Sequence, residues 1–149
     1  MKNIHSKLEQ YGAKCDEVLL SSHFREIIQE AQGKIEQLTP SQIDLDDDTI
    51  ILIDVREPEE FASGYIGGKN VLTIPRGKLE FMAIDKIGKT YGQDVTIITY
   101  CLKGPRGSLA AVQLKKMGFE NVKNLSGGIS QWLTEGYSVK SYLGELKLI

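Results

Sequence analysis

Two continuous apolar runs stand out in the pattern of hydrophobic and polar positions. One is Ile50-Ile51-Leu52-Ile53, and the other is Val95-Thr96-Ile97-Ile98-Thr99-Tyr100, in which threonines are interleaved. Runs without strict polar alternation are typical of interior strands covered on both faces, as in a parallel sheet. Because helical signals lie between and after these runs, the pattern predicts an α/β fold with a mostly parallel sheet.

Helix start and stop signals follow each predicted strand. Pro58 with the acidic residues after it suits a first helical turn, and Gly64 suits a stop. Another helix is expected to begin near Pro105 and to end before Gly118, with lysines in its last turn. Shorter helices are predicted over residues 79–84 and 129–133, and a short strand around Val122.

The first third of the chain reads as two amphipathic helices. Apolar residues recur at helical spacing over residues 8–19 and again over 20–35, with Ser21 or Ser22 as a cap and Gly33 as an end. We expect these helices to pack on the core, with Cys15 inert on the apolar face; a homodimer formed through them is the alternative. The chain thus divides into a helical extension, residues 1–34, and a domain, residues 35–149.

Composition narrows the possible classes of protein. The 149 residues suit one domain, and a net charge of −2 argues against a nucleic-acid or anionic-membrane partner. No apolar run reaches the roughly 18 residues of a membrane helix, and the N-terminus lacks a hydrophobic signal core, so we expect a cytoplasmic protein. Two histidines and two cysteines, far apart, predict neither a metal site nor a disulfide framework, and no cofactor is expected.

The segment from Tyr100 to Ser108 carries the candidate chemistry. Cys101 stands where a buried strand should end, and Pro105 presets the first residue of a helix. Gly104 lets the chain curl between them, so backbone N–H groups and the positive end of the helix dipole can face the sulfur. Lys103 and Arg106 add positive charge. These effects favour the thiolate, and they predict an anionic sulfur nucleophile in an anion-binding cradle.

A buried structural cysteine is the alternative interpretation of Cys101. The glycine, the proline and two cations within six residues of a strand end are hard to explain by packing alone. A phosphate-binding P-loop is excluded for the segment from Gly64 to Lys69, because its glycines are too close together and Asn70 replaces Ser or Thr.

Four segments, in order, resemble the rhodanese family of sulfurtransferases. The resemblance covers roughly residues 35–140. Its landmarks are Ile53-Asp54-Val55-Arg56-Glu57 followed by Glu60-Phe61 and Gly64, then Ile74-Pro75-Arg76-Gly77 with Leu79-Glu80-Phe81, then Tyr100-Cys101 through Arg106, and finally Leu125-Ser126-Gly127-Gly128-Ile129 with Trp132. Each segment alone is a weak signal, whereas all four in sequence order are specific.

The resemblance implies a rhodanese-like fold, with a five-stranded parallel sheet flanked by helices, and a reaction in two halves. A Cys101 thiolate takes sulfur from a thiosulfate-like donor, holds it as a persulfide, and passes it to cyanide or a thiol. The backbone from Leu102 through Gly104 and Pro105 to Arg106 would bind the substrate sulfur. Lys103 matches a cationic position of thiosulfate-using members, and Arg76 would be a second contact.

Three polar residues are expected to support the site. Asp54 would brace the loop at a strand end, and Arg56 would form an ion pair with Glu60; direct contact with the substrate is the alternative role for Asp54 and Arg56. The segment Tyr65-Ile66-Gly67-Gly68-Lys69 departs from the family pattern His-Ile-Pro-Gly-Ala, and we expect this loop to shape one wall of the pocket.

Two other functions stay open at this point. The domain could be a persulfide carrier or a partner-binding module that exchanges sulfur with another protein. It could also be a cysteine phosphatase or an arsenate reductase. Phosphatases of related fold use a longer loop, and the four residues between Cys101 and Arg106 suit a single sulfur atom better than a phosphoryl group.

Overall fold

A computed structural model describes residues 6–7, 9–10 and 15–148, and its centre is a five-stranded parallel sheet. The strand order is β1-β5-β4-β2-β3. The strands are β1 (Glu36–Leu38), β2 (Ile50–Asp54), β3 (Val71–Thr73), β4 (Thr96–Tyr100) and β5 (Asn121–Leu125). The predicted α/β fold with a parallel sheet is therefore confirmed, and both apolar runs form adjacent strands inside it.

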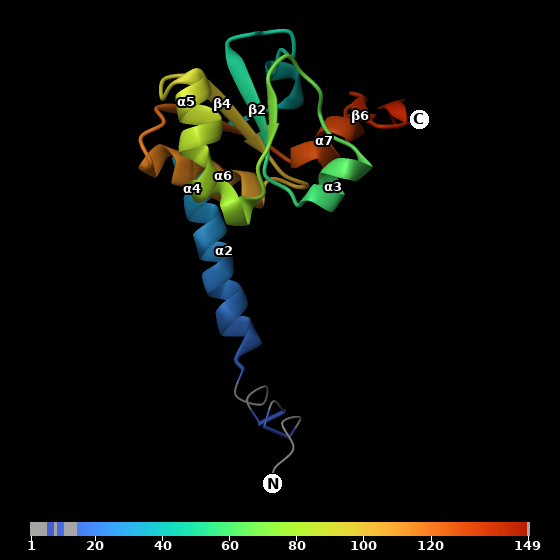
Figure 1. Cartoon of the computed structure of the whole chain (residues 1–149). Helices are drawn as coiled ribbons and strands as arrows, with labels where there is room; N and C mark the ends of the chain where they lie inside the picture. The colour runs from blue at the N-terminus through green and yellow to red at the C-terminus, as the bar shows by residue number, and fades with distance from the viewer. Residues whose placement is uncertain (1–5, 8, 11–14, 149) are drawn as a thin grey trace.

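Helices cover both faces of this sheet (Figure 1). On one face, Ile51, Ile53 and Ile97 pack with apolar residues of the helical segments between β3 and β5. These segments are α4 (Leu79–Ala83), a π turn (Ile84–Gly88), α5 (Lys89–Tyr91) and α6 (Pro105–Lys116). Because side chains alternate along a strand, the next residues of β2 and β4 face the opposite layer.

The second layer is built around Trp132 and Ile66. There Leu52, Ile98 and Tyr100 pack against them and against Val139. This layer contains α7 (Gly128–Thr134) and a small antiparallel pair, β6 (Val139–Ser141) and β7 (Gly144–Leu146), while α3 (Pro58–Ser63) follows β2. Short 3-10 turns, Pro40–Gln42 and Arg76–Lys78, complete the connections. Among the residues that the structure describes, no helix is long and apolar enough to cross a membrane.

The N-terminal region differs most from expectation. Helix α2 (Glu17–Lys34) begins after Asp16, whose side chain accepts a hydrogen bond from the Leu19 amide at 3.0 Å, so neither Ser21 nor Ser22 is the cap. Gly33 lies inside the helix. The helix expected over residues 8–19 falls partly on residues outside those described, and its last residues belong to α2.

The expectation that the N-terminal apolar residues pack on the core is wrong for most of α2. Only Ala31 of α2 is buried, whereas Leu20, Phe24 and Ile27 are exposed, and Cys15 is exposed as well. Both faces of the sheet are already covered by other elements, so α2 meets the domain only near its C-terminal end and projects away from it (Figure 1). Helical periodicity reports an apolar face but not what covers it.

Replacing Gly107, where α6 passes close to the sheet, is predicted to destabilise the fold. A Cβ at this position would lie 2.1 Å from Asn124 Oδ1 and 3.3 Å from the Tyr100 Cα. Gly107→Ala should therefore lower the free energy of unfolding by about 1–3 kcal/mol, measured by urea denaturation. Gly33→Ala is the control: it lies in a helix with open space around its Cβ and should stabilise by roughly 0.5–1 kcal/mol. Equal stability of the two variants would contradict this close approach.

Candidate active site

Cys101 directly follows β4 and is 1% exposed. The Gly104 backbone N–H donates a hydrogen bond to its Sγ at 3.0 Å. Gly104 has a φ of +120°, a conformation that L side chains rarely adopt, and α6 begins at the next residue, Pro105. The turn thus places a backbone donor and the positive end of a twelve-residue helix beside the sulfur.

Helix α7 holds the other side of this loop. The Ile129 amide donates to the Cys101 carbonyl at 2.9 Å, and the Ser130 amide donates to the Leu102 carbonyl at 3.0 Å. A Cβ at Gly128 would lie 2.5 Å from both carbonyl oxygens. Gly127 and Gly128 at the start of α7 therefore allow the helix to approach the loop backbone, and its amides fix the peptides on either side of Leu102.

Asn124, a buried residue of β5 that the sequence did not single out, holds the loop from the side of the sheet. The Asn124 side chain donates to the Gly104 carbonyl at 3.2 Å and to Ser108 Oγ at 3.1 Å. Thr99 Oγ1 lies 3.1 Å from Asn124 Oδ1 and donates to the Gly107 carbonyl at 2.8 Å. Asn124 and Thr99 are fully buried, so their polar atoms need these partners. The sequence signal that could have identified Thr99 and Asn124 is their position: both are polar residues near the end of an interior strand.

Asp54 is the second buried polar centre, at the end of β2. Its carboxylate accepts hydrogen bonds from the Arg56 backbone N–H at 2.9 Å, from the Arg56 guanidinium and from Tyr100 Oη at 3.0 Å. Arg56 also donates to the Gly64 carbonyl at 2.6 Å, and Tyr100 Oη accepts from the Ile66 amide at 3.1 Å. Burial, reinforced by the Asp54 charge, raises the pKa of Tyr100. Asp54 thus connects β2, β4 and the loop before β3.

Glu60 pairs with Arg106 and not, as expected, with Arg56. Two hydrogen bonds of 2.7 and 3.0 Å join the guanidinium to both carboxylate oxygens. Arg56 is buried and turns back on Asp54, two residues before it, so it is not available to Glu60. The bidentate contact with Arg106 lowers the pKa of Glu60 to about 2, against the desolvation that would raise it. The pair ties α3 to the first turn of α6.

Lys103 and Arg76, the two cations expected to contact the substrate, lie in different surroundings. Lys103 is exposed beside half-exposed Leu102, and it makes no ion pair with any residue that the structure describes. Arg76 instead forms an ion pair with Glu80 at 2.8 Å and lines a cavity of about 160 Å³ between α2 and α6. The structure therefore brings Leu102, Lys103, Gly104, Pro105 and Arg106 together around Cys101, whereas the Arg76 side chain is engaged elsewhere.

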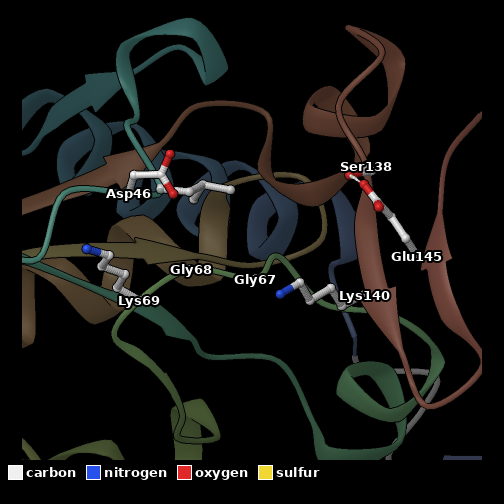
Figure 2. A pocket seen from close by; sticks show the side chains of 8 residues that line it. Asp46, Gly67, Gly68, Lys69, Ser138, Lys140 and Glu145 are labelled. Atoms are coloured by element: carbon white, nitrogen blue, oxygen red, sulfur yellow. Dashed lines mark hydrogen bonds between the residues drawn. The ribbon is translucent and has the colours of Figure 1, made fainter.

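The loop of residues 65–69 runs from the site to a separate cavity. The Ile66 amide donates a hydrogen bond to Tyr100, the residue before Cys101. The following residues, 67–69, line a cavity of about 380 Å³. Figure 2 shows Gly67 and Gly68 between two groups of charged and polar side chains: Asp46 and Lys69 on one side, and Ser138, Lys140 and Glu145 on the other. In the described part of the chain, no group of three His, Cys, Asp or Glu residues could hold a metal ion.

Acid is predicted to remove the stabilisation supplied by the Glu60–Arg106 pair. The pKa of Glu60 is lowered from 4.5 to about 2. The stabilisation is therefore complete above pH 4.5 and disappears as pH falls through 2. Urea denaturation of wild type and Glu60→Gln should show a stability difference that shrinks over this interval. Glu59→Gln, at an exposed position of the same helix, is the control. A constant difference between wild type and Glu60→Gln would contradict the prediction.

Comparison with known proteins agrees with this geometry. The chain matches the Rhodanese-like domain over residues 42–135. A sulfurtransferase of Allochromatium vinosum is 30% identical over 107 residues, which cover 72% of this chain and 94% of that protein. Thiosulfate sulfurtransferase 16, chloroplastic, of Arabidopsis thaliana is 34% identical over 94 residues, covering 60% of this chain and 78% of the relative. Two further curated relatives are matched over only 65% and 60% of their length.

Solved structures extend the likeness beyond the matched family region. The polysulfide-sulfur transferase homodimer of Wolinella succinogenes superposes with a TM-score of 0.67 at 27% identity, covering 86% of this chain and 90% of that chain. The parallel sheet, the cysteine at the end of its central strand β4 and the family match over 42–135 agree, and the chain belongs to the rhodanese-like domain family.

Proposed function

We propose that this chain is a sulfurtransferase that carries a sulfane sulfur as a persulfide on Cys101. The observation that carries the proposal is the 3.0 Å hydrogen bond from the Gly104 amide to Cys101 Sγ at a buried strand-to-helix turn. A backbone donor and a helix N-terminus stabilise negative charge on sulfur without a titratable partner. Sulfurtransferases among the relatives support the same chemistry.

The reaction has two sulfur-transfer steps. The Cys101 thiolate attacks the outer sulfur of a thiosulfate-like donor, the sulfur–sulfur bond of the donor breaks, and sulfite leaves with the bonding electron pair. The enzyme then holds a Cys101 persulfide. Cyanide, or the thiolate of an acceptor, attacks the outer sulfur; the new bond forms as the persulfide bond breaks, and the Cys101 thiolate returns.

Charge around the loop assigns different roles to its two cations. Glu60 neutralises Arg106 through a bidentate pair, so Arg106 chiefly holds α6 against α3. Lys103 is exposed in the same loop, two residues after Cys101, where it can attract a dianionic donor. Backbone N–H groups of the loop then stabilise the anionic persulfide inside the cradle.

A persulfide carrier that exchanges sulfur with a protein partner would use the same residues. It differs from a thiosulfate enzyme only in its donor and acceptor, so turnover with thiosulfate and cyanide separates the two functions. A phosphatase or arsenate reductase would need a loop that surrounds a tetrahedral anion. The four residues between Cys101 and Arg106 favour sulfur transfer over that function.

Thiosulfate is predicted to load one sulfur atom onto Cys101. Intact mass spectrometry after thiosulfate treatment should show a gain of one sulfur atom that a reductant removes. Cys101→Ser should abolish both this gain and thiocyanate formation while the fold is retained. Cys15→Ser is the matched control, because Cys15 is exposed and lies outside the loop. Sulfur loading in Cys101→Ser, or its loss in a folded Cys15→Ser, would overturn the proposal.

Removing the charge of Lys103 is predicted to impair the first half-reaction selectively. Lys103→Ala should lower kcat/KM for thiosulfate at least about fivefold, because the dianionic donor loses the exposed cation of the loop. Transfer from the preformed persulfide to cyanide, measured in single turnover, should change much less. Lys86→Ala, an exposed lysine on the π turn, should leave both unchanged. An equal loss in both half-reactions of Lys103→Ala would contradict this role.

A further inference from the structure

Helix α2 leaves a stripe of large apolar side chains uncovered. Leu20, Phe24 and Ile27 are 59%, 62% and 55% exposed, and the same line of the helix ends at Ala31, which is buried where α2 meets α6. Their spacing of four, three and four residues is that of the contact line of a coiled coil. Figure 1 shows α2 projecting from the domain, so this face is open to a partner.

The ends of the stripe carry opposite charges. Glu17 occupies the first turn, next to Asp16, and Lys34 occupies the last. Lys34 also borders the cavity between α2 and α6, together with Lys116 and Arg76. Its ion pair with Glu30 leaves the Lys34 side chain 56% exposed. A helix that is acidic at one end and basic at the other is complementary to an antiparallel copy of itself.

We propose that two copies of this chain dimerise by antiparallel pairing of their α2 helices. Placing Phe24 of one copy opposite Ile27 of the other brings Leu20 to the position of Ala31, at the edge of the cavity that Ala31 lines, and the symmetry repeats both contacts. The same register puts Glu17 of each copy opposite Lys34 of the other. A parallel pair would instead bring like charges together at both ends, which makes the antiparallel pair the favoured arrangement.

The cavity beside Ala31 offers the partner helix a second contact surface. It is about 160 Å³ in volume and lies between Ile27 and Ala31 of α2 and the α6 residues Leu109 and Val112. In the antiparallel register this is where Leu20 of the second copy arrives. A stable protein pair buries about 800 Å² on each side, and a helix about 27 Å long needs this second surface as well as its own stripe to approach that area.

Sedimentation analysis of the full chain over a range of concentrations tests the pairing. We expect wild type to dimerise and Phe24→Glu to raise the dissociation constant more than about 100-fold, because the dimer would bury two unpaired charges. Circular dichroism should show an unchanged fold, since Phe24 is exposed in the monomer. Tyr142→Glu is the matched control: Tyr142 is 89% exposed and directly follows β6, an element that Figure 1 shows away from α2.

The outcomes separate this proposal from its alternatives. Wild type that stays monomeric at millimolar concentration, Phe24→Glu that associates like wild type, or dissociation by Tyr142→Glu would each overturn it. Sulfur transfer per subunit should be the same in Phe24→Glu, because α2 lies outside the Cys101 loop. Loss of dimerisation and loss of the proposed activity are therefore distinguishable.

Charge exchange tests the antiparallel register. Glu17→Lys and Lys34→Glu alone should each weaken dimerisation about tenfold, because both ends of the pair would then carry like charges. An equal mixture of the two variants should form a heterodimer with wild-type affinity, since opposite charges meet at both ends. Single variants that dimerise like wild type, or a mixture that stays as weak as they are, would overturn the antiparallel register.

Discussion

The site depends on how closely two helices approach the turn between β4 and α6. The amide of Gly104 can reach the Cys101 sulfur only if the first turn of α6 lies directly against the sheet. Asn124 holds that turn through the Gly104 carbonyl and Ser108, and there is room for no side chain at Gly107. Backbone donors fixed in this way need no reorganisation when charge develops on sulfur, which is the basis of electrostatic preorganisation.

Ion pairs divide the cations near the loop into two groups: arginines that are held by carboxylates, and a lysine that pairs with no carboxylate in the described part of the chain. Asp54 uses Arg56, and Glu60 uses Arg106, so both arginines near the loop have carboxylate partners. Although burial alone would lower the pKa of Arg56, its hydrogen bonds with Asp54 and the charge of that carboxylate raise it. Both guanidinium groups therefore stay charged and fixed. The helix dipole, the loop amides and the exposed Lys103 are the groups left to act on the anionic sulfur donor that we propose.

The sequence predicted the parts of this arrangement that depend on local order. A strand end, a glycine and a proline in consecutive segments are sufficient to place Cys101 between β4 and α6. Partner choice depends on tertiary packing, and for that reason Glu60 was assigned to Arg56 when it binds Arg106. Asn124 was not predicted for a related reason. It holds the loop through hydrogen bonds with segments that are distant in sequence, and hydrophobic periodicity carries no information about such contacts.

The amphipathic helix α2 is a second case in which a local sequence pattern does not predict a tertiary contact. Its apolar spacing was read correctly as helical, but periodicity cannot distinguish a face that covers the core from one that a second copy covers. The exposure of Phe24 and Ile27 shows that this face does not cover the core. In an antiparallel pair of α2 helices the two domains would lie at opposite ends, so each Cys101 loop would work independently. Dimerisation through α2 would then add stability and spacing between the two sites without sharing residues between them.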